Sequence, residues 1–179
     1  MLMAEDRERR RPQFVEVYKR YMVKCKENGA MDFDDLLLNM NILFRDFPDA
    51  LAKYQYQFRY VMVDEYQDNN MAQYLIIKKI VEQHHNICVV GDDAQSIYSF
   101  RGAKIENILR FQQDYPEAKI FKLEQNYRST RNIVNAANSI IAKNQRQLKK
   151  KSFSSNAEGE KIRVFKAYTD QEEALIVVN

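Results

Sequence analysis

Residues 58–68 read FRYVMVDEYQD, and this stretch decides the fold that we expect for the chain. Its middle, residues 61–63, is entirely apolar, which is typical of a strand buried on both faces of a parallel sheet. Asp64 and Glu65 follow directly. Ligands of parallel α/β sheets bind beyond the carboxyl ends of the strands, so a carboxylate pair here indicates metal and nucleotide chemistry. An ordinary acidic turn is the alternative.

The composition of the chain is sufficient for a hydrophobic core. It has 179 residues, of which 45% are hydrophobic, enough for one domain or parts of two. No apolar stretch is long enough to span a bilayer and no leader is visible, so we expect a cytoplasmic protein without a membrane partner. Cys25 and Cys88 lie in apolar patterns and are predicted to be buried, reduced thiols. The net charge of +3 is mild, and the basic runs at residues 9–11 and 149–151 are interpreted as solvated segments, with nucleic-acid contact as the alternative.

Strands and helices alternate from residue 58 onward. We expect strands at residues 61–63, 87–90, 119–123 and 162–165, and helices at residues 70–83, 105–113, 130–143 and 171–178. This order predicts an α/β fold with a parallel sheet, right-handed crossovers and helices on both faces. The part before about residue 55 is expected to be all helical, with Gly29 ending one helix and Asp32 and Asp35 capping the next. Residues 149–159 are polar and predicted to be a loop.

Asp64, Glu65 and Gln95 carry residue types that suit phosphoryl transfer. An aspartate at a strand end can bind Mg²⁺ directly or through water, and the adjacent glutamate can act as a general base. Gln95 belongs to the second strand end, residues 91–103, which read GDDAQSIYSFRGA. Lying just past the neighbouring strand, its amide can hydrogen-bond a γ-phosphate and report whether ATP has been cleaved.

The same loop carries aromatic residues beside a cation. Tyr98 and Phe100 lie next to Arg101, and this combination suits stacking on an unpaired base together with a backbone contact. The alternative is that both rings belong to the core and that Gly102 only makes a turn.

Residues 123–130, LEQNYRST, lead from a predicted strand into a helix. Arg128 in this position can reach a phosphate as an arginine finger, and Tyr127 can stack on a flat base. The alternative is a surface arginine beside a helix that Ser129 or Thr130 caps.

Together these strings resemble the motifs of superfamily 1 DNA helicases of the UvrD/Rep/PcrA type. Residues 64–68 are similar to the family's Walker B motif, with Tyr66 where phenylalanine is usual. The other matching strings are residues 91–103 for the third motif, residues 125–130 for the fourth, and residues 31–37, MDFDDLL, for the string that precedes Walker B. The resemblance extends from about Tyr18 to the end of the chain.

The resemblance implies a nucleotide role for five matched residues, with ATP and Mg²⁺ as cofactors. Asp64 would coordinate Mg²⁺ together with Glu65, which would also activate the hydrolytic water. Gln95 would contact the γ-phosphate and couple it to DNA. Tyr127 would stack on adenine, and Arg128 would be the arginine finger.

A second group of residues is assigned to DNA by the same resemblance. Phe100 would stack on a base of single-stranded DNA, where many relatives have tryptophan, with Tyr98 beside it. Arg101 would link the DNA groove to the nucleotide site. The implied partners are single-stranded and duplex DNA, along which such helicases move from 3′ to 5′ in repair or replication, with ATP between two RecA-like domains.

The resemblance divides the chain into three parts. Residues 1–30 would end a helical insertion, residues 31–118 would form the later part of a first RecA-like ATPase domain of the P-loop NTPase type, and residues 119–179 would begin a second. A P-loop needs Gly-x-x-x-x-Gly-Lys-[Ser/Thr], and a lysine follows none of the four glycines. We therefore expect an internal fragment of a helicase, inactive alone, whose partner is the remainder of the helicase chain.

Two other functions share these features. One is a non-catalytic DNA-binding or protein-docking module that keeps the helicase fold without ATPase activity. The other is a helicase half that is fused to a nuclease. For the fragment itself we expect self-association, because a missing P-loop strand would leave a sheet edge and a core face uncovered.

Overall fold

The computed structural model of the protein describes residues 13–145 and 147–178, with only the backbone of Arg101. The basic run at residues 9–11 therefore lies outside the described residues. The chain forms two compact units, Met1–Arg110 and Phe111–Asn179. None of the helices within the described ranges has both the length and the apolar composition needed to span a bilayer.

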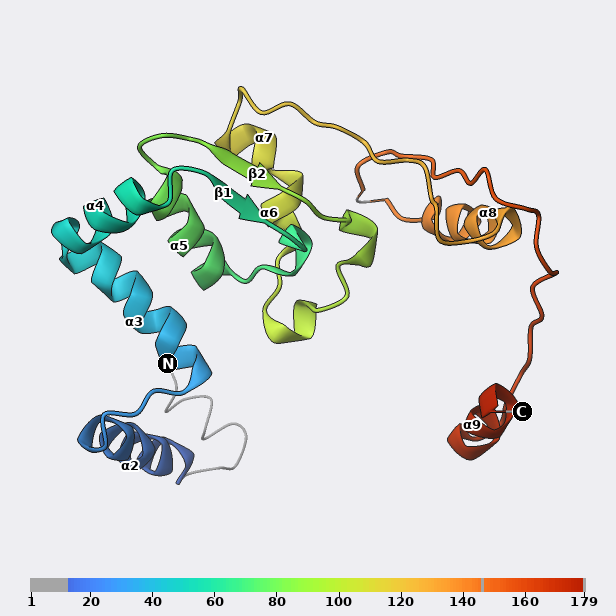
Figure 1. The fold of residues 1–179 in the computed structure, drawn as a ribbon. Helices are drawn as coiled ribbons and strands as arrows, with labels where there is room; N and C mark the ends of the chain where they lie inside the picture. The colour runs from blue at the N-terminus through green and yellow to red at the C-terminus, as the bar shows by residue number, and fades with distance from the viewer. Residues whose placement is uncertain (1–12, 146, 179) are drawn as a thin grey trace. The chain divides into compact units, whose positions relative to one another are not determined.

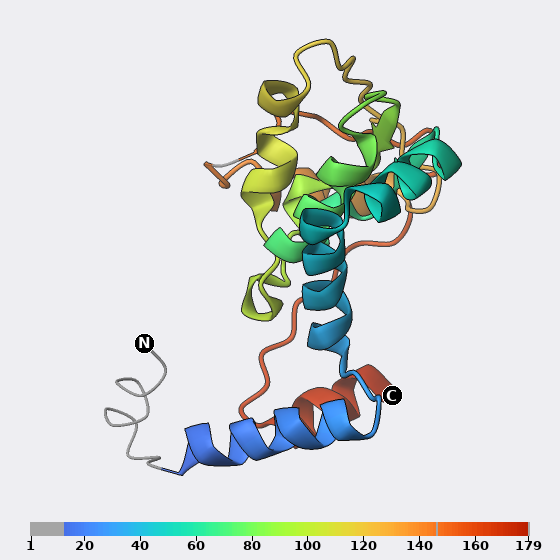
Figure 2. The same cartoon turned by 90° about the vertical axis from the view of Figure 1, so that its left-hand side faces the viewer.

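The first unit begins with three helices, as the all-helical prediction requires. They are α2 (Phe14–Glu27), α3 (Phe33–Asp46) and α4 (Pro48–Gln57). Just after α2, Gly29 adopts a φ of 60°, the left-handed conformation that glycine permits. The chain turns sharply there before α3 begins (Figure 2). The prediction that Gly29 ends this helix is confirmed.

The start of α3 is held by a reciprocal pair of hydrogen bonds. The Asp35 amide donates to Asp32 Oδ1 at 2.8 Å, and the Asp32 amide donates to Asp35 Oδ2 at 3.3 Å, which confirms the predicted cap. The amide of Asp35, and then the hydroxyl of Tyr21, hold the pKa of Asp32 below its usual value. Asp32 therefore stabilises the fold above the carboxyl's unfolded pKa, and this contribution disappears as the pH falls through the folded pKa.

Helix α5 (Met71–Val81) packs beside α3 and α4 (Figure 1). Asn70 caps it, as its Oδ1 accepts the Gln73 amide at 2.9 Å. Two side-chain amides tie the three helices together. Asn41 Nδ2 donates to the Ala72 carbonyl at 3.1 Å, and Nε2 of the buried Gln55 donates to the Lys79 carbonyl at 2.8 Å.

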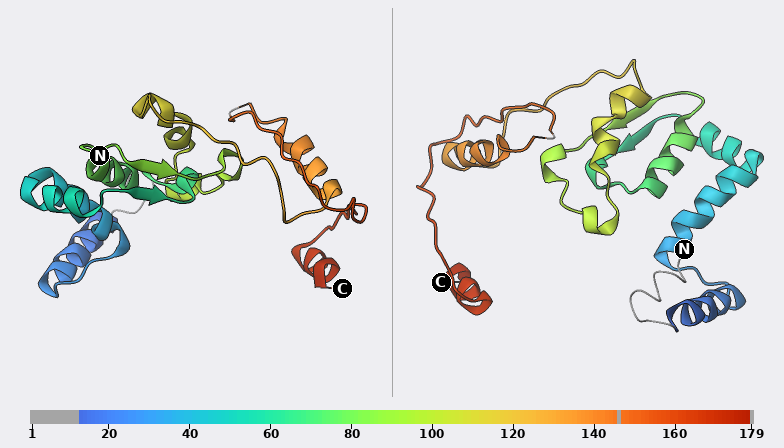
Figure 3. Two further views of the ribbon diagram at one scale, coloured as in Figure 1. Left: turned by 45° about the horizontal axis from the view of Figure 1, so that its top comes forward. Right: turned by 180° about the vertical axis from the view of Figure 1, so that it is seen from behind.

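The sheet of the described chain has two parallel strands, β1 (Val61–Val63) and β2 (Ile87–Val89), which lie side by side (Figure 3). Both predicted strands and their parallel pairing are confirmed. The prediction that both faces are buried is wrong for this chain, because Met62 is 79% exposed. Side chains alternate along a strand, and Met62 pairs with Cys88, so the Cys88 thiol is also exposed rather than buried.

The chain leaves the sheet region through a broken helix. α6 (Ile105–Leu109) packs against the turns that follow both strands, and Arg110 interrupts the helix with φ −96° and ψ 1°. α7 (Phe111–Asp114) then opens the second unit. The single helix predicted over residues 105–113 is therefore wrong, since Arg110 leaves the helical region of φ and ψ.

The second unit contains α8 (Arg131–Ile141) and α9 (Asp170–Val178), close to their predicted positions. The strands predicted at residues 119–123 and 162–165 do not form in the described chain. A strand exists only through hydrogen bonds to a neighbour, and apolar alternation alone supplies none. The pairing in this region is a single parallel bridge between Gln125 and Phe153.

The predicted loop at residues 149–159 is confirmed, and it runs along α8. Asn138 on α8 forms two hydrogen bonds with the backbone of Ser152. Its Nδ2 donates to the Ser152 carbonyl at 2.7 Å, and its Oδ1 accepts the Ser152 amide at 3.2 Å. Further along, the Arg131 amide donates to the Ala157 carbonyl at 3.1 Å. The loop and the start of α8 are thus one ordered element.

Candidate functional site

The ends of β1 and β2 meet at one edge of the sheet. The Val90 amide donates to the Val63 carbonyl at 2.8 Å, and the Tyr66 amide donates to the Val90 carbonyl at 2.9 Å. Parallel pairing therefore continues past the strands and draws the two following loops together. Gln95 does follow the strand adjacent to that of Asp64, as predicted.

Asp64 and Glu65 form a sharp, exposed turn after β1. Glu65 has φ 48° and ψ 43°, a left-handed conformation that is uncommon for a residue with a side chain. Asp64 Oδ1 accepts the Glu65 amide at 2.9 Å and fixes this turn. The short helix η1 (Tyr66–Asp68) follows. The chain therefore leaves the extended conformation of β1 at Glu65.

Gln67 joins this turn to the loop after β2. Its side chain is 1% exposed, its Nε2 donates to Glu65 Oε2 at 2.7 Å, and its Oε1 accepts the Asp92 amide at 3.0 Å. The approach is so close that a Cβ at Gly91 would lie 2.6 Å from Gln67 Oε1 and 2.9 Å from Ile108 Cδ1. A side chain at this position would require Gln67 or Ile108 to shift.

Asp92 carries the connection on to Gln95. Asp92 Oδ1 accepts the Ala94 amide at 3.0 Å, which caps the short helix η2 (Asp93–Gln95). Asp92 Oδ2 accepts Gln95 Nε2 at 2.9 Å, and Gln95 is exposed. Hydrogen bonds therefore run without a break from Glu65 through Gln67 and Asp92 to Gln95.

The carboxylates of Asp64 and Glu65 fit a magnesium ion. Mg²⁺ prefers oxygen ligands and is usually held by one or two carboxylates, with water and substrate phosphates completing the octahedron. Both side chains are exposed, Asp64 Oδ1 accepts the Glu65 amide, and Glu65 Oε2 accepts Gln67 Nε2. Within residues 13–145 and 147–178 no three His, Cys, Asp or Glu side chains gather into a larger metal cluster. The donor set thus suits an ion shared with a nucleotide.

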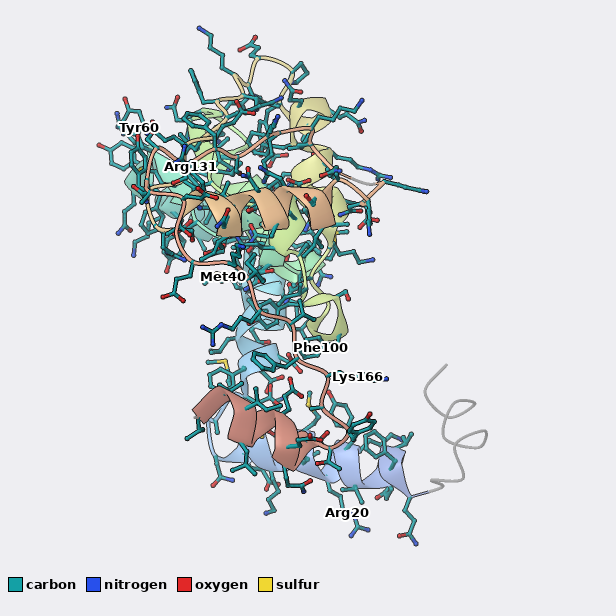
Figure 4. All side chains as sticks on the ribbon, turned by 90° about the vertical axis from the view of Figure 1, so that its right-hand side faces the viewer. Arg20, Met40, Tyr60, Phe100, Arg131 and Lys166 are labelled. Atoms are coloured by element: carbon teal, nitrogen blue, oxygen red, sulfur yellow. The ribbon has the colours of Figure 1, made fainter. Side chains whose placement is uncertain are left out.

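The aromatic residues of the second loop lie at the surface. Phe100, labelled in Figure 4, lies in the short helix η3 (Ser99–Arg101) and is 76% exposed. Tyr98 is 39% exposed. Their ring centroids are 5.9 Å apart with planes inclined by 40°. The core interpretation is therefore wrong for Phe100. The side chain of Arg101 lies outside the described residues.

The base of this aromatic loop is tied back to the first loop. Ala103 forms an antiparallel bridge with Asn70, and the Lys104 amide donates to the Asn69 carbonyl at 3.2 Å. Gly102 makes the turn between them with a φ of 84°. The loop is anchored at its ends and exposes its rings between them.

In the second unit, Tyr127 and Arg128 lie in a turn before α8. Asn126 Oδ1 accepts the amides of Arg128 at 3.0 Å and Ser129 at 2.8 Å, a side-chain-closed turn. Tyr127 is 77% exposed, and Arg128 is exposed as well. Thr130 occupies the N-cap position, but its hydroxyl makes no capping bond, so the predicted side-chain cap is wrong. The turn depends on Asn126 instead.

Sequence reasoning assigned no role to Gln67, Asp92 or Asn126. Gln67 and Asp92 belong to the quoted strings, but their contact spans 25 residues of sequence. Asn126 had a local signal, since asparagine often closes turns by accepting nearby amides. No pattern in the sequence indicates that the Gln67 side chain is buried.

Two family models match the chain. The UvrD/REP helicase N-terminal domain matches residues 2–116, and the UvrD-like helicase C-terminal domain matches residues 121–179. ATP-dependent DNA helicase PcrA of Staphylococcus epidermidis is 50% identical over 162 residues, which are 90% of this chain and 22% of that protein. The PcrA of Staphylococcus aureus is 48% identical over the same shares of both chains.

These matches establish the class of the protein. The chain belongs to the UvrD/Rep helicase family. The resemblance inferred from the motif strings is thereby confirmed. The chain spans 22% of the length of the PcrA helicases that it matches.

Replacing Gly91 tests the close approach of the two loops. We expect Gly91→Ala to lower the free energy of unfolding by about 1–3 kcal/mol, because the new methyl group crowds Gln67 and Ile108. Denaturant unfolding of the chain measures this loss. Gly29→Ala is a comparison for backbone strain without crowding, since a Cβ there meets nothing within 4 Å but its φ of 60° should itself cost about 1–2 kcal/mol. An unchanged midpoint for Gly91→Ala would contradict the packing described above.

Proposed function

We propose that the protein of which this chain is part is an ATP-dependent DNA helicase that moves 3′ to 5′ on single-stranded DNA and unwinds duplexes in repair or replication. The observation that carries the proposal is the joined pair of loops after β1 and β2, which places Glu65 and Gln95 on one hydrogen-bonded path. This path joins the residue assigned to water activation to the loop that carries Gln95 and Phe100. Family membership supports the same reaction.

Each nucleotide-site residue has a role in this proposal. Asp64 binds Mg²⁺ with Glu65 beside it, and the Glu65 carboxylate takes a proton from the attacking water. Gln95 senses the γ-phosphate. Tyr127 stacks on adenine, and Arg128 supplies positive charge to the transferring phosphoryl group. The exposure of all five side chains leaves them open to a ligand.

The DNA-binding role is assigned to the aromatic loop. Phe100 and Tyr98 stack on unpaired bases, and Arg101 connects the DNA groove with the nucleotide site. The exposure of Phe100 supports this assignment. Because β1 and β2 are parallel and followed by nucleotide-type loops, we assign residues 31–118 to a RecA-like domain whose full sheet includes further strands. Residues 1–30 are assigned to a helical insertion, and residues 119–179 to a second RecA-like domain.

Substituting Glu65 tests the catalytic assignment. In the full-length protein, Glu65→Gln should lower kcat for DNA-stimulated ATP hydrolysis by about 10²–10⁴-fold, because an amide cannot accept the proton of the attacking water. Steady-state ATPase assays measure the effect. The 179-residue chain alone should show no turnover, because it has no P-loop lysine or backbone cradle for the phosphates. ATPase activity of the isolated chain that Glu65→Gln removes would instead make the chain a self-sufficient enzyme.

Substituting Phe100 tests the DNA assignment. In the full-length protein, Phe100→Ala should weaken binding of a single-stranded oligonucleotide by about 1–3 kcal/mol through loss of base stacking. Fluorescence anisotropy measures the dissociation constant. Tyr56→Ala is the matched control, since this ring on α4 is 73% exposed and lies outside the loop. Equal affinities for Phe100→Ala and the unmodified protein would exclude a stacking role.

The exposed apolar surface of the chain generates a separate expectation. In the first unit Tyr60, labelled in Figure 4, is 81% exposed. Met62 is 79% exposed, and Phe121, Leu123 and Val164 of the second unit are 81–91% exposed. Surfaces of this kind associate in water. We therefore expect the isolated chain to self-associate, with a scattering mass that rises with concentration. A constant monomer mass at high concentration would contradict this.

The second candidate is a non-catalytic module that binds DNA or docks a protein. The observation in its favour is that a lysine follows none of the chain's glycines, as a P-loop requires. In that case the full-length protein would keep the Phe100-dependent DNA affinity but show no ATPase activity. The ATPase assay of the unmodified full-length protein therefore separates the two functions.

A further inference from the structure

Gln67 differs from the other members of the site in being fully enclosed. Its side chain is 1% exposed, whereas Asp64, Glu65 and Gln95 are exposed. An enclosed residue cannot touch nucleotide or DNA from this position. Its effect on the reaction must therefore pass through the groups that it holds.

The two hydrogen bonds of Gln67 require a donor and an acceptor on one rigid group. Nε2 donates to Glu65 Oε2 at 2.7 Å, and Oε1 accepts the Asp92 amide at 3.0 Å. A side-chain amide provides both functions in a single plane. Glutamate keeps the acceptor but loses the donor, and methionine has neither. The length of glutamine is matched by the space that Gly91 leaves open.

The main chain of Gln67 is held as well as its side chain. The Ser96 hydroxyl donates to the Gln67 carbonyl at 3.4 Å, so the loop after β2 is hydrogen-bonded to Gln67 at a second point. The Glu65 backbone is fixed by Asp64 Oδ1, but its carboxylate is exposed and on a long side chain. The hydrogen bond from Gln67 Nε2 therefore holds the Glu65 carboxylate in place.

We propose that Gln67 is a positioning residue that holds the Glu65 carboxylate in a fixed position relative to the loop that carries Gln95. The inference rests on the proposed function, because Glu65 must be the water-activating group for its position to matter. Gln67 orients Glu65 through Nε2 and fixes the Gln95 loop through Oε1 and Asp92. Movement of the loop after β2 is thereby transmitted to the carboxylate, and movement of the carboxylate to the loop.

Two substitutions in the full-length protein separate the bond to Glu65 from the bond to the Asp92 amide. Gln67→Glu retains an acceptor for the Asp92 amide but removes the donor to Glu65 and adds a like charge. Gln67→Met removes both bonds at similar volume. We expect kcat for DNA-stimulated ATP hydrolysis to fall by about 10–100-fold in both variants, as for other residues that orient catalytic ligands. The KM for ATP and the dissociation constant for single-stranded DNA should not change.

Gln55→Met is the matched control. Gln55 is a buried amide, 5% exposed, that bonds the Lys79 carbonyl away from the site. It should lower the melting temperature as Gln67→Met does, and leave kcat unchanged. A fall in kcat for Gln67→Glu that matches that of Gln55→Met, or no fall at all, would overturn the proposal.

A double-mutant cycle tests the link to Gln95. If Gln67 couples the loops, the effects of Gln67→Met and Gln95→Ala on kcat should deviate from simple multiplication by a factor of about two or more. Independent effects would overturn the coupling. Glu65→Gln in the same assays shows whether the role of Glu65 is wrong or only the role of Gln67. If that variant keeps full activity, the proposed catalytic role of Glu65 is wrong and the inference fails with it, whereas if it is inactive and Gln67→Glu is fully active, only the inference fails.

Discussion

The parallel pairing of β1 with β2 is the constraint on which the site depends. The pairing continues past the strands through the Tyr66 amide and the Val90 carbonyl, so two loops that are distant in sequence begin at the same point. Their approach is close enough that Gly91 cannot carry a side chain without displacing Gln67 or Ile108. A pairing of only a few residues therefore brings the acidic turn and the polar loop into contact, where a buried amide can bond to both.

Burial is distributed unevenly among the functional residues, and the distribution follows their tasks. The residues that we assign to ligand contact, Glu65, Gln95 and Phe100, are exposed. Gln67, which bonds Glu65 and the Asp92 amide, is enclosed, where its hydrogen bonds do not compete with water. The strained backbone of Glu65 is stabilised by the Asp64 side chain and compensated by this surrounding network. The exposed turn at Asp64 and Glu65 is thus stabilised by a hydrogen bond from the buried Gln67.

The second unit is organised by asparagine side chains rather than by a sheet. Asn126 closes the turn that carries Tyr127 and Arg128, and Asn138 holds the loop at residues 149–159 against α8. Asn126 does so through a local turn, and Asn138 by bonding both the carbonyl and the amide of Ser152. The turn before α8 is therefore ordered even though residues 119–123 are not paired in a sheet.

The sequence by itself determined the family, the two strand ends and the helix starts at Asp32 and Asn70. Each of these depends on residues that are close together in the chain, so the patterns of apolar and polar residues are sufficient. Only the tertiary structure decided that Met62 and Cys88 face outward, that the segment at residues 119–123 stays unpaired, and that Gln67 connects Glu65 to Asp92. Those features depend on partners many residues away, and no local pattern encodes which distant backbone or side chain will supply the bond.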